Sequence, residues 1–147
     1  MQIKNKTIEF QTSKAPNFID TTSELENFLE ETQIKNGIMN VQIMHTSAAL
    51  ILNENEPLLI EDFKKNIEKI ASSAEDYNHD DFDRRTVNMC NNECRNGHAH
   101  CKAIYFLPNI TLNIIDKKLQ LGQWQRVFLV ELDRARQRKI QIQILGN

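Results

Sequence analysis

The sequence lacks most of the features that would assign it to a specialised class of protein. No apolar run approaches the roughly 20 residues that a membrane-spanning helix needs. The first residues, MQIKNKTIEFQTSK, contain no apolar segment of the kind found in secretory signals. Cysteine occurs three times, an odd number that favours reduced thiols over a disulfide framework. These absences predict a soluble, cytoplasmic protein.

The sequence also lacks a large excess of charge of either sign. The formal net charge is −2 and the isoelectric point is about 6.1, so no basic surface is expected that would attract nucleic acid or an anionic membrane. No internal repeat, low-complexity linker or shift in composition divides the chain. At 147 residues, it is predicted to form one domain, residues 1–147.

The first half of the chain alternates between strand and helix patterns. Alternating apolar and polar residues predict strands at 3–12 and 38–46, and a short apolar run predicts another at 48–53. Apolar residues at helical spacing predict helices at 21–37 and 57–70, with Pro57 opening the second. The polar stretch 72–97 has no clear period and is predicted to be a loop, which at this length is typically functional or disordered.

The second half is predicted to be rich in strands. The segments that carry this pattern are HAHCKAIYFL, ITLNII, KLQL, RVFLVELD and KIQIQIL. Hairpin turns are expected at 116–117 and 133–137. The complete order predicts an α+β fold, in which helices pack on a mixed or largely antiparallel sheet.

Two of the four histidines stand on either side of one alanine, in the segment NGHAHCKA. On a strand, His98 and His100 would lie on one face, about 6–7 Å apart along the chain. At that spacing, two imidazoles can converge on one ion or on one anionic group. The interpretation as a pair therefore depends on this segment being a strand.

The other two histidines also lie beside polar groups. His45 leads into Thr46 at a predicted strand end, and His79 precedes Asp80. If their strands are neighbours, His45, His98 and His100 could bind a divalent metal, as three imidazoles do in catalytic zinc sites. Asp80 or Asp81 could orient one imidazole. An anion site with protonated histidines is the alternative.

Polar segments elsewhere allow two interpretations each. In NENE, Asn53 could bind substrate and Glu54 could act as a general acid or base, but a solvated turn before a helix is the simpler interpretation. The segment RARQRK, residues 134–139, is most simply a solvated turn, although its arginines could hold a phosphate. Trp124 is expected to anchor a core or an interface. The three cysteines are interpreted as bystander thiols: Cys90, Cys94 and Cys101.

Four motifs together resemble the YjbQ family, small proteins often labelled secondary thiamine-phosphate synthases. These motifs are HTSAALILNENE, YNHDD, RNGHAHCKA and LGQWQRVFLVELD, and the similarity runs from about Ile38 to Gly146. The resemblance implies a single α+β domain, a homotrimer and a polar, histidine-rich pocket. Carried onto this chain, the pocket would contain His45, Thr46, Asn53, Glu54, His79, Asp80, His98 and His100, with Trp124 close by.

The resulting hypothesis is an enzyme that acts on a small phosphorylated metabolite, either as a thiamine-phosphate synthase, a transferase, or as a metal-assisted hydrolase. The metal, zinc or magnesium, would be held by His45, His98 and His100. The catalytic residues would be His45, Glu54, His79 and Asp80. The substrate would contact Thr46, Asn53 and Trp124. The alternatives are a non-catalytic trimeric binding protein for a small anionic metabolite, and histidines that serve only as subunit contacts.

Overall fold

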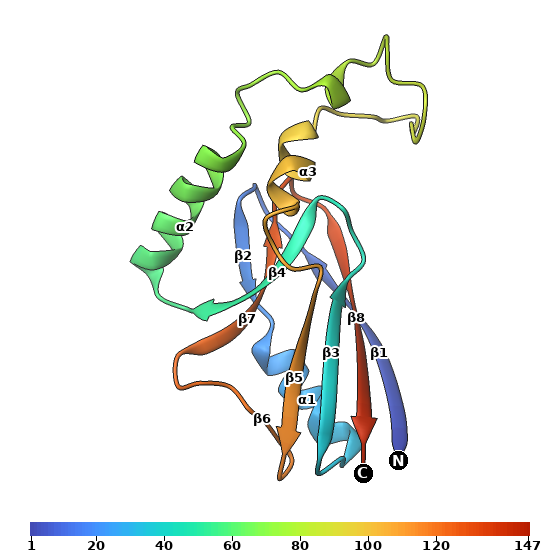
Figure 1. Ribbon diagram of the computed structural model, residues 1–147, viewed down its shortest axis with the longest axis vertical. Helices are drawn as coiled ribbons and strands as arrows, with labels where there is room; N and C mark the ends of the chain where they lie inside the picture. Colours follow the sequence, from blue (N-terminus) through green and yellow to red (C-terminus); the bar gives the residue numbers. More distant parts are fainter.

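The structure, a computed structural model that describes residues 1–147, contains two antiparallel sheets and three α-helices (Figure 1). The larger sheet has the strand order β1-β8-β3-β5-β6 and the smaller sheet the order β2-β7-β4. The strands are β1 (Gln2–Gln11), β2 (Asn17–Asp20), β3 (Gly37–Ile43), β4 (Ala48–Glu54), β5 (Asn109–Ile115), β6 (Lys118–Leu119), β7 (Gln125–Glu131) and β8 (Gln137–Gly146). The helices are α1 (Thr22–Thr32), α2 (Pro57–Ile70), the short 3₁₀ helix η1 (Asn78–Asp80) and α3 (Gly97–Ala103). The predicted α+β fold is confirmed.

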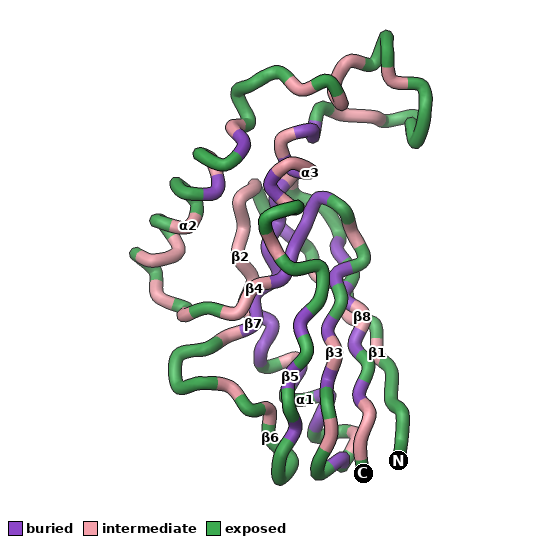
Figure 2. Tube along the Cα trace, viewed as in Figure 1, coloured by how far each residue is buried: buried purple, intermediate pink, exposed green.

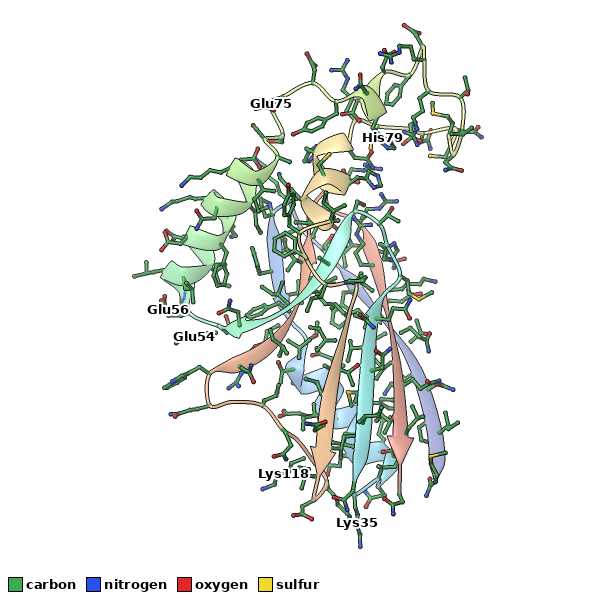
Figure 3. All side chains as sticks on the ribbon, viewed as in Figure 1. Lys35, Glu54, Glu56, Glu75, His79 and Lys118 are labelled. Carbon is green, nitrogen blue, oxygen red and sulfur yellow. The ribbon has the colours of Figure 1, made fainter.

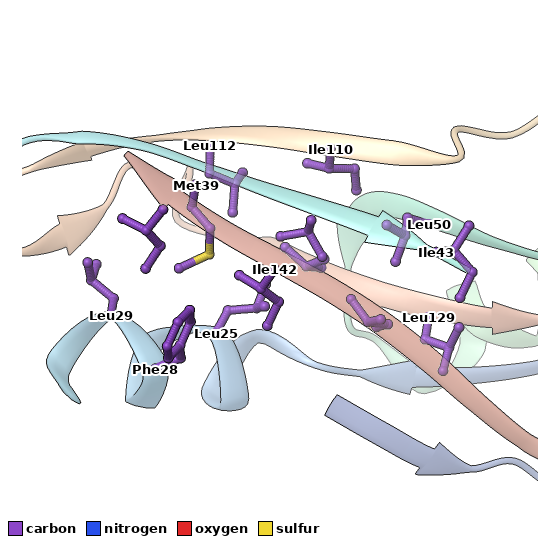
Figure 4. Packing of buried hydrophobic residues seen from close by; sticks show 14 of the residues in the cluster. Leu25, Phe28, Leu29, Met39, Ile43, Leu50, Ile110, Leu112, Leu129 and Ile142 are labelled. Carbon is purple, nitrogen blue, oxygen red and sulfur yellow. The ribbon is translucent and has the colours of Figure 1, made fainter. Parts of the chain in front are cut away.

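The main core lies between the larger sheet and α1. Alternate residues of β3, β5 and β8 point inward, and Leu25, Phe28 and Leu29 of α1 pack among them (Figure 4). Opposite the helix lie Met39 and Ile142, both with no exposed surface. This arrangement explains the two-residue period of the strands, since a shift by one residue would turn the buried isoleucines outward.

A second, smaller core joins α2 and α3 to the smaller sheet. It contains Ile67 of α2, Ala99 of α3, and Phe128 and Val130 of β7. Most of the remaining surface of α2 is exposed or half-buried (Figure 2). None of the helices combines the length and the apolar composition needed to cross a bilayer.

The predicted element boundaries are confirmed in part. Helix α2 begins at Pro57 as expected, and the carboxylate of Glu56 caps it by accepting hydrogen bonds from two backbone amides. The first helix ends at Thr32 rather than near Gly37, which begins β3 instead. A Cβ atom at Gly37 would lie 2.0 Å from the carbonyl oxygen of Leu145, so this glycine permits close strand pairing and does not end a helix.

The remaining connections show one unpredicted strand, one confirmed turn and one expected hairpin that does not form. Residues 133–137 join β7 to β8, which belong to different sheets and do not pair with each other. Strand β2 has only four residues and was not expected. Asp116 and Lys117 form the turn between β5 and β6 with positive φ angles of 50° and 64°. The segment 72–97 is a loop as predicted, apart from the short turn of η1.

A buried ion pair joins the two sheets. Glu131 of β7 and Arg138 of β8 are both essentially inaccessible to solvent, and the Arg138 Nε atom lies 2.6 Å from a carboxylate oxygen of Glu131. Thr12 donates a hydrogen bond to the same carboxylate, and Arg138 donates to both the carbonyl and the hydroxyl oxygen of Ser47. Burial opposes ionisation of Glu131, but the hydrogen bonds from Arg138, the Asp133 amide and Thr12 lower its pKa overall.

The substitution Glu131→Gln is expected to destabilise the fold by about 3–5 kcal/mol, because it leaves Arg138 buried without its counter-charge. The matched change Glu31→Gln removes one partner of the exposed Lys6–Glu31 pair and is expected to cost at most about 1 kcal/mol. Urea unfolding at neutral pH measures both losses. Equally small losses would show that the buried pair is not required to join the sheets.

Candidate functional site

Three segments that are distant in the sequence meet at one end of the molecule. They are the connection between β3 and β4, which carries His45, the helix η1, which carries His79, and α3, which carries His100. The imidazoles of His79 and His100 are 4.7 Å apart between ring centroids. His45, Thr46 and His100 line a common cavity of about 770 Å³, called the histidine hollow below. Figure 3 shows His79 beside the start of α3, far from Lys35 and Lys118 at the other end.

Asp80 fixes η1 against the first turn of α3. One of its carboxylate oxygens accepts hydrogen bonds from the backbone amides of Asn96 and Gly97, each at 2.9 Å. Gly97 is required at this contact, because a Cβ atom there would lie 2.5 Å from the Cβ atom of Tyr77. Asp80 therefore positions the backbone that carries His79 and His100, and it makes no hydrogen bond to either imidazole.

The segment that carries His98 and His100 is a helix, so the predicted strand at this position is wrong. Helix α3 forms because Ala99 and Lys102, three residues apart, are buried together, with Ala99 in the smaller core. The Lys102 ammonium lies 2.7 Å from the carboxylate of Glu68 on α2. Burial opposes this charge on Glu68, but its hydrogen bond from Lys102 and further bonds from Ser73 lower its pKa to about 2.

The helical conformation separates the two histidines that the sequence pattern paired. Residues two apart on a helix lie about 200° apart around its axis. The ring of His98 lies toward Tyr77, with 6.4 Å between centroids, whereas His100 lies beside His79 and lines the histidine hollow. His98 and His100 therefore do not present a common face to one ion.

His45 has a fixed tautomer and a cationic environment. Its Nε2 atom accepts a hydrogen bond from the backbone amide of Lys139 at 2.8 Å, which leaves the proton on Nδ1. Burial lowers the pKa of His45, and the positive charges of Arg138, Arg136 and Lys139 lower it further, while Glu131 acts in the opposite direction. His45 is therefore neutral at pH 7 and has one N–H group available to donate.

The imidazoles of His98 and His100 are also held in the neutral form. Burial lowers the pKa of His100, and so does its neighbour His79, against an opposing contribution from Asp133. Burial likewise lowers the pKa of His98, followed by the charge of Lys102. The Nε2 atom of His79 is buried and has no hydrogen-bond partner in the protein. A buried polar atom without a partner is uncommon and is found preferentially at functional sites.

Sequence reasoning missed a group of charged residues around the histidines. Asp133 is buried at its side chain and lies 2.7 Å from Arg134 and 3.3 Å from Arg136. Arg85 is also largely buried and pairs with Glu93 at 3.3 Å.

The RARQRK segment was interpreted most simply as a solvated turn, with arginines that could hold a phosphate as the alternative. Arg136 is exposed, Arg134 is half-buried and Arg138 is buried. The charges of Arg136 and Arg138 reach His45. The signal that could have found them is the density of arginine beside two buried strands.

The cysteines occupy the loop and the helix near these charges without joining each other. All three thiols are free. Cys94 accepts a hydrogen bond from the guanidinium of Arg134, and burial raises the pKa of its thiol. This arrangement is consistent with the interpretation of the cysteines as bystanders.

The other predicted site residues lie at the opposite end of β4. Glu54 pairs in register with Gln125, the residue after Trp124, so these residues share that end of the smaller sheet. Six residues of strand separate Glu54 from Ala48, a distance of about 20 Å. Asn53 is exposed and accepts a hydrogen bond from the backbone amide of Glu54 at 2.9 Å. Figure 3 shows Glu54 close to Glu56 at the start of α2 and away from His79.

Trp124 does not anchor the core of the chain. Its side chain is 63% exposed, in the connection between β6 and β7. The structure therefore brings His45, Thr46, His79, Asp80 and His100 together and leaves Asn53, Glu54 and Trp124 apart from them.

Comparison with known proteins identifies the family of this chain. The family model described as "UPF0047 protein YjbQ-like" matches residues 6–147. A UPF0047 protein of Methanothermobacter thermautotrophicus is 30% identical over 146 residues, which is 99% of this chain and 94% of the relative. The UPF0047 protein YugU of Bacillus subtilis is 30% identical over 142 residues, covering 96% of this chain and 98% of the relative.

Solved structures show the same fold. A YbjQ-like protein of unknown function from Sulfolobus solfataricus has a TM-score of 0.87 and 31% identity, with 99% of each chain covered. A hypothetical protein from Aeropyrum pernix has a TM-score of 0.86 and 27% identity, with 98% of this chain and 99% of that chain covered. These descriptions name no reaction, substrate or metal.

These findings correct the functional hypothesis drawn from the sequence. No group of three or more histidine, cysteine, aspartate or glutamate side chains is arranged to hold a metal ion, so the metal-binding pocket formed by His45, His98 and His100 was wrongly predicted. The predicted thiamine-phosphate synthase or metal-assisted hydrolase has no support, since the matching relatives carry no such activity in their descriptions. The resemblance itself is confirmed: the chain belongs to the UPF0047 family of YjbQ-like proteins.

Proposed function

We propose that the protein binds a small phosphorylated metabolite in the histidine hollow. The observation that carries this proposal is the charge around His45. Besides burial, three cationic side chains lower the pKa of His45: Arg138, Arg136 and Lys139. The carboxylate of Glu131 acts in the opposite direction. Each of the three cations also pairs with a carboxylate, Arg138 with Glu131, Arg136 with Asp133 and Lys139 with Glu9. The positive potential at His45 therefore comes from cations held in fixed positions, and it would attract an anion.

The donors that line the hollow suit phosphate oxygens. The Nδ1–H group of His45 is available because Nε2 accepts the hydrogen bond from Lys139. Thr46 is exposed and adds a hydroxyl group, and His100 adds a second imidazole. Phosphate has several strong acceptor oxygens, so it can use donors that approach from different elements.

The nearby carboxylates favour a binding role. Glu131 is engaged by Arg138 and Thr12, and Asp133 by Arg134 and Arg136. These carboxylates neutralise arginines and hold them in place. The arrangement therefore supports recognition of an anion by fixed donors.

We expect inorganic phosphate to bind the wild-type protein and to bind His45→Ala and His100→Ala about tenfold or more weakly, because each variant loses an imidazole donor to the anion. The matched control is His98→Ala, since the ring of His98 lies against Tyr77 instead of lining the hollow. Isothermal titration calorimetry measures the affinities. Wild-type affinity in both His45→Ala and His100→Ala would disprove the proposed site.

The affinity is also expected to depend on pH. Burial first, and the neighbouring imidazole of His79 next, hold the pKa of His100 below the usual range, so binding a dianion beside the charged form of His100 is accompanied by proton uptake. His45 stays neutral, because its Nε2 atom already accepts the hydrogen bond from the Lys139 amide. Sulfate is a suitable probe, because it stays a dianion through this pH range.

The Kd for sulfate should therefore fall about tenfold or more between about pH 7.5 and about pH 5.5, as protonation of His100 becomes favourable. The variant His100→Ala should show a flat profile over the same range. A flat profile in the wild-type protein would contradict the involvement of His100 in anion binding.

We further propose that copies of the chain associate, as a homotrimer, through the outer face of the larger sheet. Two rows of uncharged side chains cross this face in register. The first row is Asn5, Gln143, Asn40 and Thr111, and the second is Thr7, Gln141, Gln42 and Asn109. Exposed sheet faces normally carry charges, and the cores of protein interfaces are depleted of them. These two uncharged rows, bordered on the same face by the Glu9–Lys139 ion pair, support contact with another copy.

Asn40→Lys/Gln143→Lys is expected to give a particle of one chain, 17.1 kDa, where the wild-type protein gives one of three chains. Two ammonium groups would have to be buried in the interface. Gln120→Lys, outside these rows, serves as the control and should leave the assembly intact. Light scattering after size-exclusion chromatography measures the mass, and a single-chain wild-type particle at micromolar concentration would exclude the assembly.

We also place the protein in the cytoplasm. All three of its thiols are free, and one of them, Cys90, is exposed. Exposed free thiols are typical of reducing compartments.

A further inference from the structure

The histidine hollow is larger than a phosphate group bound at its polar end would fill. A cavity of about 770 Å³ falls within the range that holds whole organic molecules, about 300–1,000 Å³. The imidazoles and the threonine occupy one part of its lining. Most of the other lining residues are apolar, so an inorganic anion would leave the larger part of the hollow without a matching partner.

Exposed apolar side chains form the rest of this lining. Met44, Ile104 and Leu107 line the hollow and are 53%, 78% and 54% exposed, respectively. Met44 follows β3, and the other two lie in the connection between α3 and β5. Large apolar side chains that gather around a cavity with convergent polar groups are typical of ligand sites.

This apolar wall is held in place by the strands beneath it. The backbone amide of Leu50 donates to the carbonyl oxygen of Leu107 at 2.9 Å, and that of Ile43 donates to Pro108 at 2.9 Å. The side chain of Phe106 packs against the smaller core. The connection therefore presents Ile104 and Leu107 from a fixed backbone, at low entropic cost to a ligand that contacts them.

We infer that the ligand of the histidine hollow is an organic phosphate with an apolar body, whose phosphate group contacts His45 and His100 and whose body covers Ile104 and Leu107. This inference rests on the proposed function and specifies the part of the ligand that the proposed function leaves open. A phosphate on a polar body, such as a sugar, would leave the apolar wall exposed to water.

Three probes separate the contributions of the two ends. Phenyl phosphate carries both the anion and an apolar body, glycerol 3-phosphate carries the same anion on a polar body, and inorganic phosphate carries the anion alone. Phenyl phosphate is expected to bind the wild-type protein at least about tenfold more tightly than the other two. Its ring would bury apolar surface against the hollow, and a gain of about 1.4 kcal/mol in binding free energy corresponds to a factor of ten in Kd.

The variant Ile104→Ser/Leu107→Ser is expected to lose this preference, so that phenyl phosphate binds no better than glycerol 3-phosphate. Both side chains are exposed, so the change leaves the cores intact. The matched control is Leu58→Ser/Val87→Ser, which alters exposed apolar residues, each at 68% exposure, outside the hollow and outside the larger sheet, and should keep the preference.

The outcomes distinguish this inference from the proposed function. Equal affinities for the three probes in the wild-type protein would overturn the inference and leave anion binding intact, whereas no binding of any probe would overturn both. A preference that survives Ile104→Ser/Leu107→Ser would also overturn the inference. A change in particle mass in that variant, without any preference in the wild-type protein, would assign the apolar wall to contact with another copy of the chain.

Discussion

The ion pair between Glu131 and Arg138 holds the two sheets in one arrangement. Each residue ends or begins a strand of a different sheet, and both are buried where the sheets meet. Charges buried at such a position are costly unless every hydrogen-bonding group finds a partner. Thr12, Ser47 and the amide of Asp133 supply further partners, so the chain must bring its first strand, the start of β4 and the β7–β8 turn to the same place.

The same requirement builds the candidate site. Ser47 lies two residues after His45, and Lys139 follows Arg138 directly. When Ser47 and Arg138 meet, the amide of Lys139 reaches the Nε2 atom of His45 and fixes its tautomer. The charge of Arg138 then reaches His45 as well and lowers its pKa, after burial. The backbone arrangement that forms the buried ion pair therefore also places the positive charges beside His45.

The sequence indicates the larger sheet well because the physical signal is local. Ile140, Ile142 and Ile144 alternate with polar residues on β8, and half-buried strands require that alternation. Pro57 marks the start of α2 for a similarly local reason, since its ring fits the first helical turn. Such features depend on neighbouring residues only, and tertiary contacts did not change them.

The errors arise where distant contacts decide the local structure. HAHCKA alternates in polarity and resembles a strand, but contacts of Ala99 with the smaller core and of Lys102 with Glu68 make it a helix. The position of RARQRK beside the histidines likewise depends on the burial of Arg138 against Glu131, which no period in the sequence indicates. The sequence was sufficient to predict that His45, His79 and His100 lie in one cluster. It was not sufficient to predict how their imidazoles are arranged.

The motifs HTS and NEN are separated by few residues, yet strand β4 carries them apart. An extended strand gains about 3.3 Å per residue, so Asn53 and Glu54 lie beyond the reach of a small ligand held by His45. Within one chain, the two motifs must serve different purposes. Glu56, beside them, already caps α2. For Asn53 or Glu54 to contact the ligand of a histidine hollow, that hollow must belong to another copy of the chain.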